Sequence, residues 1–248
     1  MNDRVLTAPI STDTNLIFIP HPKERFYVNV CLGSRLMARW FCLERGHQHL
    51  EAKGHRAFAP TIAGHGKGVN KNVNHAQCTQ SIVDYIVDKD LTDIVLLGHS
   101  FGRTIIAKVA EAISGRIRRL IFFAAFVPRD GESLIDNVPP DYQAVFNNIA
   151  RASDDNTIMM PFELWRDAFV NDADLELARS SYAQLSPEPY QPSIEKLDLQ
   201  QFTRCRFPKV TSIVQKTTPF LKASGDGIRE CLTAWGDFSL CKCPVVMR

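Results

Sequence analysis

The stretch from Ile94 to Arg103 of this 248-residue chain reads IVLLGHSFGR and narrowly limits the folds that the chain can adopt. Apolar residues lead into Gly98-His99-Ser100-Phe101-Gly102, which has the pattern G-x-S-x-G. A buried strand before this pattern and a helix after it would place Ser100 at the tip of a sharp turn. Glycines on both sides of the serine relieve the crowding of such a turn. The stretch therefore predicts a strand, a sharp turn that carries the serine, and a helix, in that order.

Apolar runs alternate with helical spacing along much of the chain. The spacing predicts strands at 16–19, 55–60, 93–97, 120–127 and 209–215, and helices at 40–53, 76–89, 103–113 and 162–170. The segment 21–40 follows neither pattern. Alternating strands and helices indicate βαβ units and a parallel sheet, and nearly continuous apolar strands indicate helices on both faces. The expected fold class is α/β.

The pattern changes between about 130 and 200, where prolines cluster at 139, 140, 187, 189 and 192. Short helical pieces between prolines are typical of a cap inserted over the edge of a sheet. We therefore expect one domain over 15–248 with a small helical cap at 130–200. The polar residues 1–14 are expected to form a flexible tail.

Composition narrows the classes of partner. A net charge of +2 is too small to indicate a nucleic-acid partner. The basic cluster Arg116–Arg119 is interpreted as a solvated turn before a strand. The chain has no apolar run near 18 residues, so no membrane span is expected. The first residues lack the apolar core of a secretion signal.

Seven cysteines without a disulfide spacing indicate free thiols in a reducing compartment, which predicts a cytoplasmic protein. Cys241 and Cys243 are an alternative pair of metal ligands, but the sequence offers no second ligand pair beside them. We therefore expect neither a metal nor an organic cofactor.

The chain resembles the α/β-hydrolase superfamily, and within it the esterase group of plant methylesterases, hydroxynitrile lyases and their bacterial relatives. The matching stretches are LEAKGHRAFAPTIAGHGKG, LTDIVLLGHSFGRTIIAKVAE and RIRRLIFFAAFVPRDGESLIDNVPP, and more loosely LDLQQFTRCRFPK and WGDFSLCKCP. The resemblance implies an α/β-hydrolase-type sheet and a small ester or acyl substrate. It also implies that Ser100 is the nucleophile, that the Phe101 amide helps to bind the oxyanion, and that Gly98, His99 and Gly102 form the elbow.

The sequence departs from this family at the partners of the serine. The family's order is Ser, then acid, then His, but the histidines stand at 21, 47, 49, 55, 65, 75 and 99, and none follows Ser100. Asp226 and Asp237 are downstream but not at the expected strand end. Where relatives have a Gly-Ser-His turn and a last helix, this sequence ends PVVMR, so a truncated C-terminal strand and helix are expected.

The departures from the family's pattern concern both the oxyanion hole and the catalytic base. Relatives have a His-Gly turn after the first strand, and this chain reads His21-Pro22-Lys23 there. Proline has no N–H to donate, so the second oxyanion donor is missing from that place. His65, in a loop after a strand, is the best candidate for a recruited base. His21 is the next, as a residue at the edge of the substrate site, and His99 is expected to point away from Ser100.

Three interpretations remain open. The chain is an esterase of weak activity that uses Ser100 and an unusual base, or an inactive hydrolase homologue (a pseudoenzyme) that binds a small apolar ligand or a protein partner. In the third interpretation, the chain is a divergent or mis-spliced product in which the loss of a helix exposes an apolar face of the sheet. Such a face favours association, for example as a homodimer.

Overall fold

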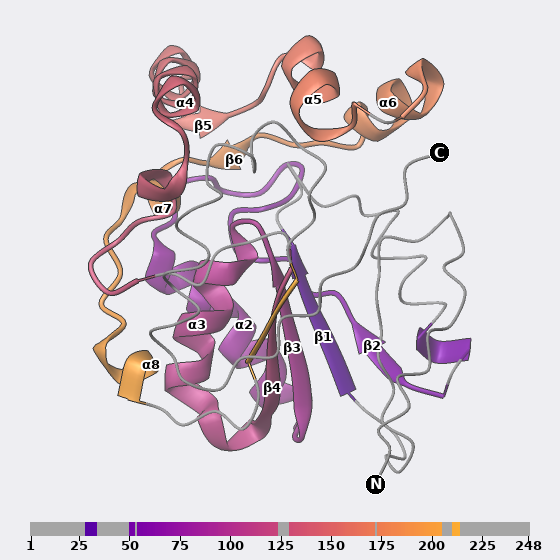
Figure 1. The fold of residues 1–248 in the computed structure, drawn as a ribbon, viewed down its shortest axis with the longest axis vertical. Helices are drawn as coiled ribbons and strands as arrows, with labels where there is room; N and C mark the ends of the chain where they lie inside the picture. The colour runs from indigo at the N-terminus through magenta and orange to yellow at the C-terminus, as the bar shows by residue number, and fades with distance from the viewer. Residues whose placement is uncertain are drawn as a thin grey trace, which may run out of the picture.

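The computed structural model describes residues 28–33, 50–52, 54–123, 129–171, 173–204 and 210–213. Five parallel strands in these ranges form one sheet in the order β2-β1-β3-β4-β7 (Figure 1). The strands are β1 (Val28–Gly33), β2 (Arg56–Phe58), β3 (Ile94–His99), β4 (Ile117–Phe123) and β7 (Val210–Ile213). Strand β3, which carries the G-x-S-x-G pattern, is the central strand.

Strand β1 lies in the segment 21–40, where the sequence shows neither strand nor helix periodicity. It pairs with β3 along its whole length, from Val28 opposite Ile94 to Gly33 opposite His99. The chain that follows this neighbour of β3 therefore starts at residue 34, whereas the sequence predicts the corresponding turn at His21. The predicted strand at 16–19 and most of the predicted helix at 40–53 lie outside the described residues, but residues 50–52 are helical.

The strand predicted at 120–127 begins earlier, because β4 starts at Ile117. Part of the basic cluster is therefore strand, which corrects its interpretation as a turn. Arg116 ends a short 3₁₀ helix and forms an ion pair with Asp90 at 2.9 Å, and Arg118 lies 3.4 Å from Asp93. These neighbours offset the positive charge of the cluster.

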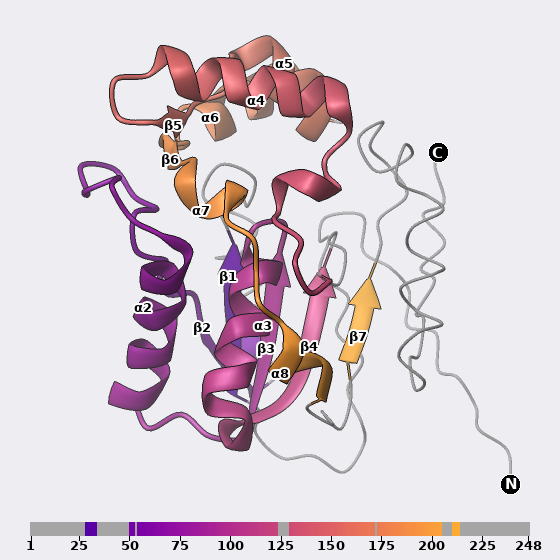
Figure 2. The same cartoon turned by 90° about the vertical axis from the view of Figure 1, so that its left-hand side faces the viewer.

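Two helices, α2 and α3, lie on one face of the sheet, and the apolar core lies between them and the strands (Figure 2). Helix α2 (His75–Asp88) begins with a capping box, in which Asn74 and Gln77 satisfy each other's backbone N–H groups. Helix α3 (Gly102–Ile113) follows the elbow, and most of its residues are buried because it lies between the sheet and α2. Both helices match the predicted ranges to within one residue. Apolar side chains of α2, α3, β3 and β4 form a single cluster, including Ile82, Ile86, Leu96, Ile105, Ile106, Leu120 and Phe122.

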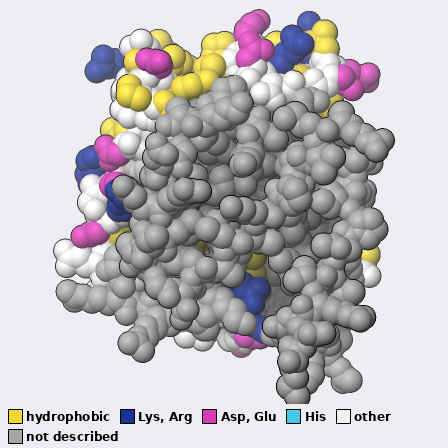
Figure 3. Space-filling view, viewed as in Figure 1, with side chains coloured by type: hydrophobic (Ala, Val, Ile, Leu, Met, Phe, Trp, Pro, Cys, Tyr) yellow, Lys and Arg dark blue, Asp and Glu magenta, His cyan; other side chains and the backbone are white. Residues whose placement is uncertain are grey.

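The predicted cap is a separate helical layer above the carboxyl ends of the strands (Figure 2). It contains α4 (Pro140–Ala152), β5 (Thr157–Ile158), α5 (Phe162–Phe169), α6 (Leu175–Tyr182), β6 (Glu188–Pro189) and α7 (Gln191–Ile194). Strands β5 and β6 pair in antiparallel fashion. The cap has its own apolar core, centred on Phe146, Met160, Trp165 and Tyr190. Along its edge in Figure 3, side chains of both charge signs alternate with apolar ones.

The chain enters and leaves the cap through two segments that are hydrogen-bonded to each other. The N–H of Gly131 donates to the carbonyl of Leu197 at 2.8 Å, and the N–H of Leu197 donates to the carbonyl of Glu132 at 3.1 Å. The chain then returns to the sheet through α8 (Gln200–Arg204), which contacts α3.

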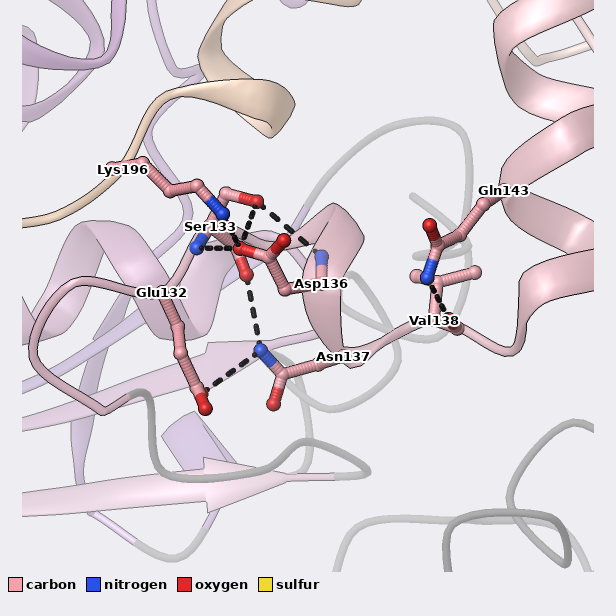
Figure 4. Close-up of polar contacts among 7 residues, drawn as sticks. All are labelled: Glu132, Ser133, Asp136, Asn137, Val138, Gln143 and Lys196. Carbon is pink, nitrogen blue, oxygen red and sulfur yellow. Dashed lines mark hydrogen bonds and ion pairs between the residues drawn. The ribbon is translucent and has the colours of Figure 1, made fainter.

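Asp136, in the short 3₁₀ helix Ile135–Asn137, is the polar centre of this crossing (Figure 4). One carboxylate oxygen accepts hydrogen bonds from Ser133 Oγ at 2.6 Å and from Lys196 Nζ at 2.5 Å. Partial burial alone would raise the pKa of Asp136, but the hydrogen bonds from Lys196 and Ser133 outweigh it and lower the pKa to about 2. These bonds join the entry and exit of the cap to each other.

Within the described residues, no helix combines the length and apolar character needed to span a membrane.

Candidate active site

Ser100 occupies the turn between β3 and α3, at the carboxyl end of the central strand. Its φ angle is +49°, in the left-handed region that residues with a Cβ atom rarely adopt. Holding a non-glycine residue there costs about 1–3 kcal/mol, and such strain gathers at functional sites. Helix α3 begins directly, with the N–H of Arg103 donating to the carbonyl of Ser100 at 3.1 Å. The predicted order of strand, sharp turn and helix is confirmed.

Gly98 is required by close approach of the backbone. A Cβ atom at this position would lie 2.6 Å from the carbonyl oxygen of Gly102 and 2.9 Å from the nitrogen of Arg103. Both glycines are buried. Only a residue without a side chain lets the end of β3 run this close to the start of α3.

Phe101, directly after Ser100, is buried between two histidine rings. The ring of His65 stacks on it with centroids 5.0 Å apart and planes 18° apart. The ring of His75 meets it edge-on, with centroids 5.9 Å apart. The first turn of α3 is thus held from both sides. The predicted role of the Phe101 amide as oxyanion donor depends on this turn and stays a prediction.

His65 lies in the loop between β2 and α2 and is 2% exposed. Its Nδ1 atom is 2.9 Å from the carbonyl oxygen of Ala63. Because a carbonyl only accepts, Nδ1 carries the hydrogen, and Nε2 is the basic nitrogen of the neutral ring. Burial lowers the pKa of His65 to about 4, although the hydrogen bond to Ala63 raises it, and the charge of Lys71 lowers it further. His65 is therefore neutral at pH 7.

A chain of hydrogen bonds that sequence reasoning missed reaches the elbow from α2. The hydroxyl of Thr104 donates to the carbonyl of Phe101 at 2.8 Å, so it accepts from His75 Nε2, which lies 2.9 Å away. Thr79 Oγ1 lies 3.4 Å from His75 Nδ1 and donates to it. Burial, with a smaller effect of the Lys108 charge, lowers the pKa of His75 to about 4. No local sequence signal links His75 with Thr104, because 29 positions separate them.

His99 is the last residue of β3, and burial lowers its pKa to about 4. His21, Asp226 and Asp237 lie outside the described residues, as do Cys241 and Cys243. In the part of the chain that the structure describes, no three His, Cys, Asp or Glu side chains group as a metal site would require.

Comparisons with known proteins agree with this geometry. A family model described as "Alpha/beta hydrolase family" matches residues 31–224. The chain is 35% identical over 104 residues to the carbendazim hydrolyzing esterase of Nocardioides sp. (strain SG-4G). That match covers 39% of this chain and 43% of the esterase, so it spans less than half of either protein.

Solved structures extend the likeness over most of the chain. An extracellular alpha/beta-hydrolase from a Paenibacillus species superposes with a TM-score of 0.75 at 37% identity, covering 86% of this chain and 88% of its own. Its description states structural and functional homology to tobacco salicylic acid binding protein 2. A methylesterase from Arabidopsis shares the fold, with a TM-score of 0.63 at 16% identity and coverage of 87% and 89%. The family model and the Paenibacillus relative, together with the elbow at Ser100, show that the chain belongs to the alpha/beta hydrolase family.

Proposed function

We propose that this protein is a serine esterase that uses Ser100 to cleave a small ester or related acyl substrate. The observation that carries the proposal is the left-handed φ angle of Ser100, +49°, at the end of the central strand. Strain of this kind is kept where it presents a nucleophile to a substrate. The esterase named among the relatives supports the same reaction class.

In the proposed reaction, Ser100 Oγ forms a bond to the carbonyl carbon of the ester and gives up its proton to a base. The carbonyl electron pair moves to oxygen, and the Phe101 amide at the start of α3 stabilises the resulting oxyanion. The intermediate collapses by breaking the bond to the alcohol oxygen, which takes the proton from the base. Water then attacks the acyl-serine in the same manner and releases the acid.

His65 is the base that we propose. Its Nδ1–H donates to the carbonyl of Ala63, an orientation that leaves the Nε2 lone pair as the proton acceptor. Its ring contacts Phe101, the neighbour of Ser100.

The same features predict slow turnover. A base with a pKa of about 4 has little affinity for a proton at neutral pH, so it activates a serine hydroxyl poorly. Loss of a member of an ordinary triad commonly lowers the rate by about four orders of magnitude or more. We therefore expect an esterase far weaker than one with a complete triad.

The low proton affinity of His65 also favours a second candidate, an inactive hydrolase homologue that binds a small apolar ligand or a protein partner. Hydrolysis of p-nitrophenyl acetate distinguishes the two. Turnover that is lost in Ser100→Ala but kept in Ser180→Ala, a change at an exposed position of the cap helix α6, supports the esterase. Equal turnover in the wild type and Ser100→Ala contradicts it.

A further inference from the structure

Lys71 joins the loop that carries His65 to the cap. Its Nζ atom donates to three backbone carbonyls, those of Gly64 at 3.0 Å, Gly66 at 2.6 Å and Pro187 at 2.8 Å. The first two carbonyls belong to the His65 loop (residues 61–67), and the third belongs to the cap. An ammonium group has three N–H donors, so these three carbonyls match its full donor capacity.

The two carbonyls in the His65 loop stand on either side of His65. Lys71 therefore holds the Gly64–His65 peptide and the Gly66–Lys67 peptide, one on each side of this histidine. The His65 N–H also donates to the carbonyl of Ile62 at 2.9 Å, which closes a tight turn. Backbone and side chain of His65 are thus fixed by separate bonds, since its ring is oriented by Ala63 and Phe101.

Independent steric evidence shows that this loop lies directly against the cap. A Cβ atom at Gly64 would lie 2.5 Å from Val73 Cγ2 and 3.1 Å from Pro189 Cγ, a residue of β6. Gly64 also has a φ angle of +78°, which favours glycine. Figures 1 and 2 both show the chain between β2 and α2 beside β6. The cap, the His65 loop and the elbow are therefore in continuous contact.

We propose that Lys71 is a positioning residue, which fixes the His65 loop between the cap and the elbow and so sets the place of His65 relative to Ser100. The proposal rests on the proposed function for its effect on the reaction. Its structural part, the clamp itself, can be tested without activity.

The chain supplies a matched control for this clamp. Lys67 also reaches the cap, through a hydrogen bond from Nζ to the carbonyl of Ala183 at 3.0 Å, but it is exposed and does not hold the peptides beside His65. Lys71→Met and Lys67→Met each remove one ammonium group and keep most of the side-chain length. The difference between the effects of the two variants therefore reports the hydrogen bonds from Lys71 to the His65 loop, separately from the loss of a lysine near the cap.

Hydrogen–deuterium exchange of the full chain tests the clamp. We expect Lys71→Met to speed exchange of the His65 amide by about tenfold or more, because the His65 loop loses the bonds from Lys71 that hold its turn. Lys67→Met should leave the exchange rate of that amide unchanged. Unchanged exchange in folded Lys71→Met overturns the proposal, whether or not the wild type hydrolyses esters. If Lys71→Met does not fold, Lys71→Gln, which keeps two N–H donors, takes its place.

Hydrolysis of p-nitrophenyl acetate tests the effect on the reaction. A displacement of about 1 Å at a reacting group can lower a rate about a hundredfold, so we expect kcat per folded molecule to fall at least tenfold in Lys71→Met and less than twofold in Lys67→Met. KM should change little. Faster exchange with unchanged kcat would leave the clamp standing and overturn its positioning role. A wild type without Ser100-dependent hydrolysis would instead overturn the proposed function.

Discussion

The ring of His65 stacks on the ring of Phe101, with centroids 5.0 Å apart. The two residues come from loops that follow different strands: His65 lies between β2 and α2, and Phe101 lies between β3 and α3. This contact places a neutral imidazole beside the residue that follows Ser100.

Replacing His65 by asparagine removes the base but keeps a side-chain N–H that can donate to Ala63. We expect His65→Asn to lower kcat/KM for p-nitrophenyl acetate by about a hundredfold or more, the usual contribution of a general base. The measurement compares initial rates at pH 7.5 after thermal unfolding has shown that the variant is folded. An unchanged rate removes His65 from the mechanism.

The pKa of His65 also determines the shape of the pH profile. Because the base works only when deprotonated and its pKa is about 4, the rate should stay level from pH 7 down to about 5 and fall by half near pH 4. Profiles of kcat/KM measured on stable samples between pH 3.5 and 8 check this. A half-maximal rate near 6.5, the ordinary value for histidine, would assign the reaction to another group.

Buried neutral histidines should make the fold sensitive to acid. His75 has a pKa of about 4 when folded and about 6.5 when unfolded, so between these values the unfolded chain binds a proton that the native chain does not. This part of the stability is present above pH 6.5 and is lost as the pH falls to 4. Each such histidine steepens the slope of the unfolding free energy by up to about 1.4 kcal/mol per pH unit.

The His75→Gln variant isolates this contribution. Glutamine can still donate to Thr104 but does not titrate. Urea unfolding at pH 7, 6, 5 and 4.5 should show a slope smaller by about one proton in His75→Gln than in the wild type. Equal slopes in the two proteins would mean that His75 does not stay neutral in the native state.

The elbow predicts a steric effect at Gly98. Gly98→Ala places a methyl group against the backbone of Gly102, which cannot move away as a flexible side chain could. We expect a loss of about 1–3 kcal/mol in the free energy of unfolding and a loss of Ser100-dependent hydrolysis. Gly115→Ala, where an added Cβ atom meets nothing within 4 Å, is the control and should be nearly neutral. Equal stability of the two variants contradicts the close approach.

The sequence predicts the local parts of this site better than its tertiary contacts. The G-x-S-x-G pattern located the turn at Ser100, because strand, glycines and helix follow one another in the chain. Strand β1 escaped detection, since its six residues lie in a segment with charged residues on both sides and no clear period. Its assignment comes from its pairing with β2 and β3.

The contacts around the elbow depend on the folded topology. The sequence predicts His65 at the edge of the site from its place after a strand, but its stacking on Phe101 and its lowered pKa depend on burial in the folded chain. The hydrogen bond between His75 and Thr104 joins α2 to α3. Lys71 binds Pro187, which is 116 residues away. No spacing rule along the chain connects such partners.

The proposed esterase activity requires Ser100 to be a working nucleophile. Reaction with a fluorophosphonate probe, followed by intact mass spectrometry, measures this on the folded wild type beside Ser100→Ala and Ser180→Ala. We predict one probe per chain in the wild type and in Ser180→Ala, and none in Ser100→Ala. Folded wild type that stays unlabelled, or labelling that persists in Ser100→Ala, would contradict the claim.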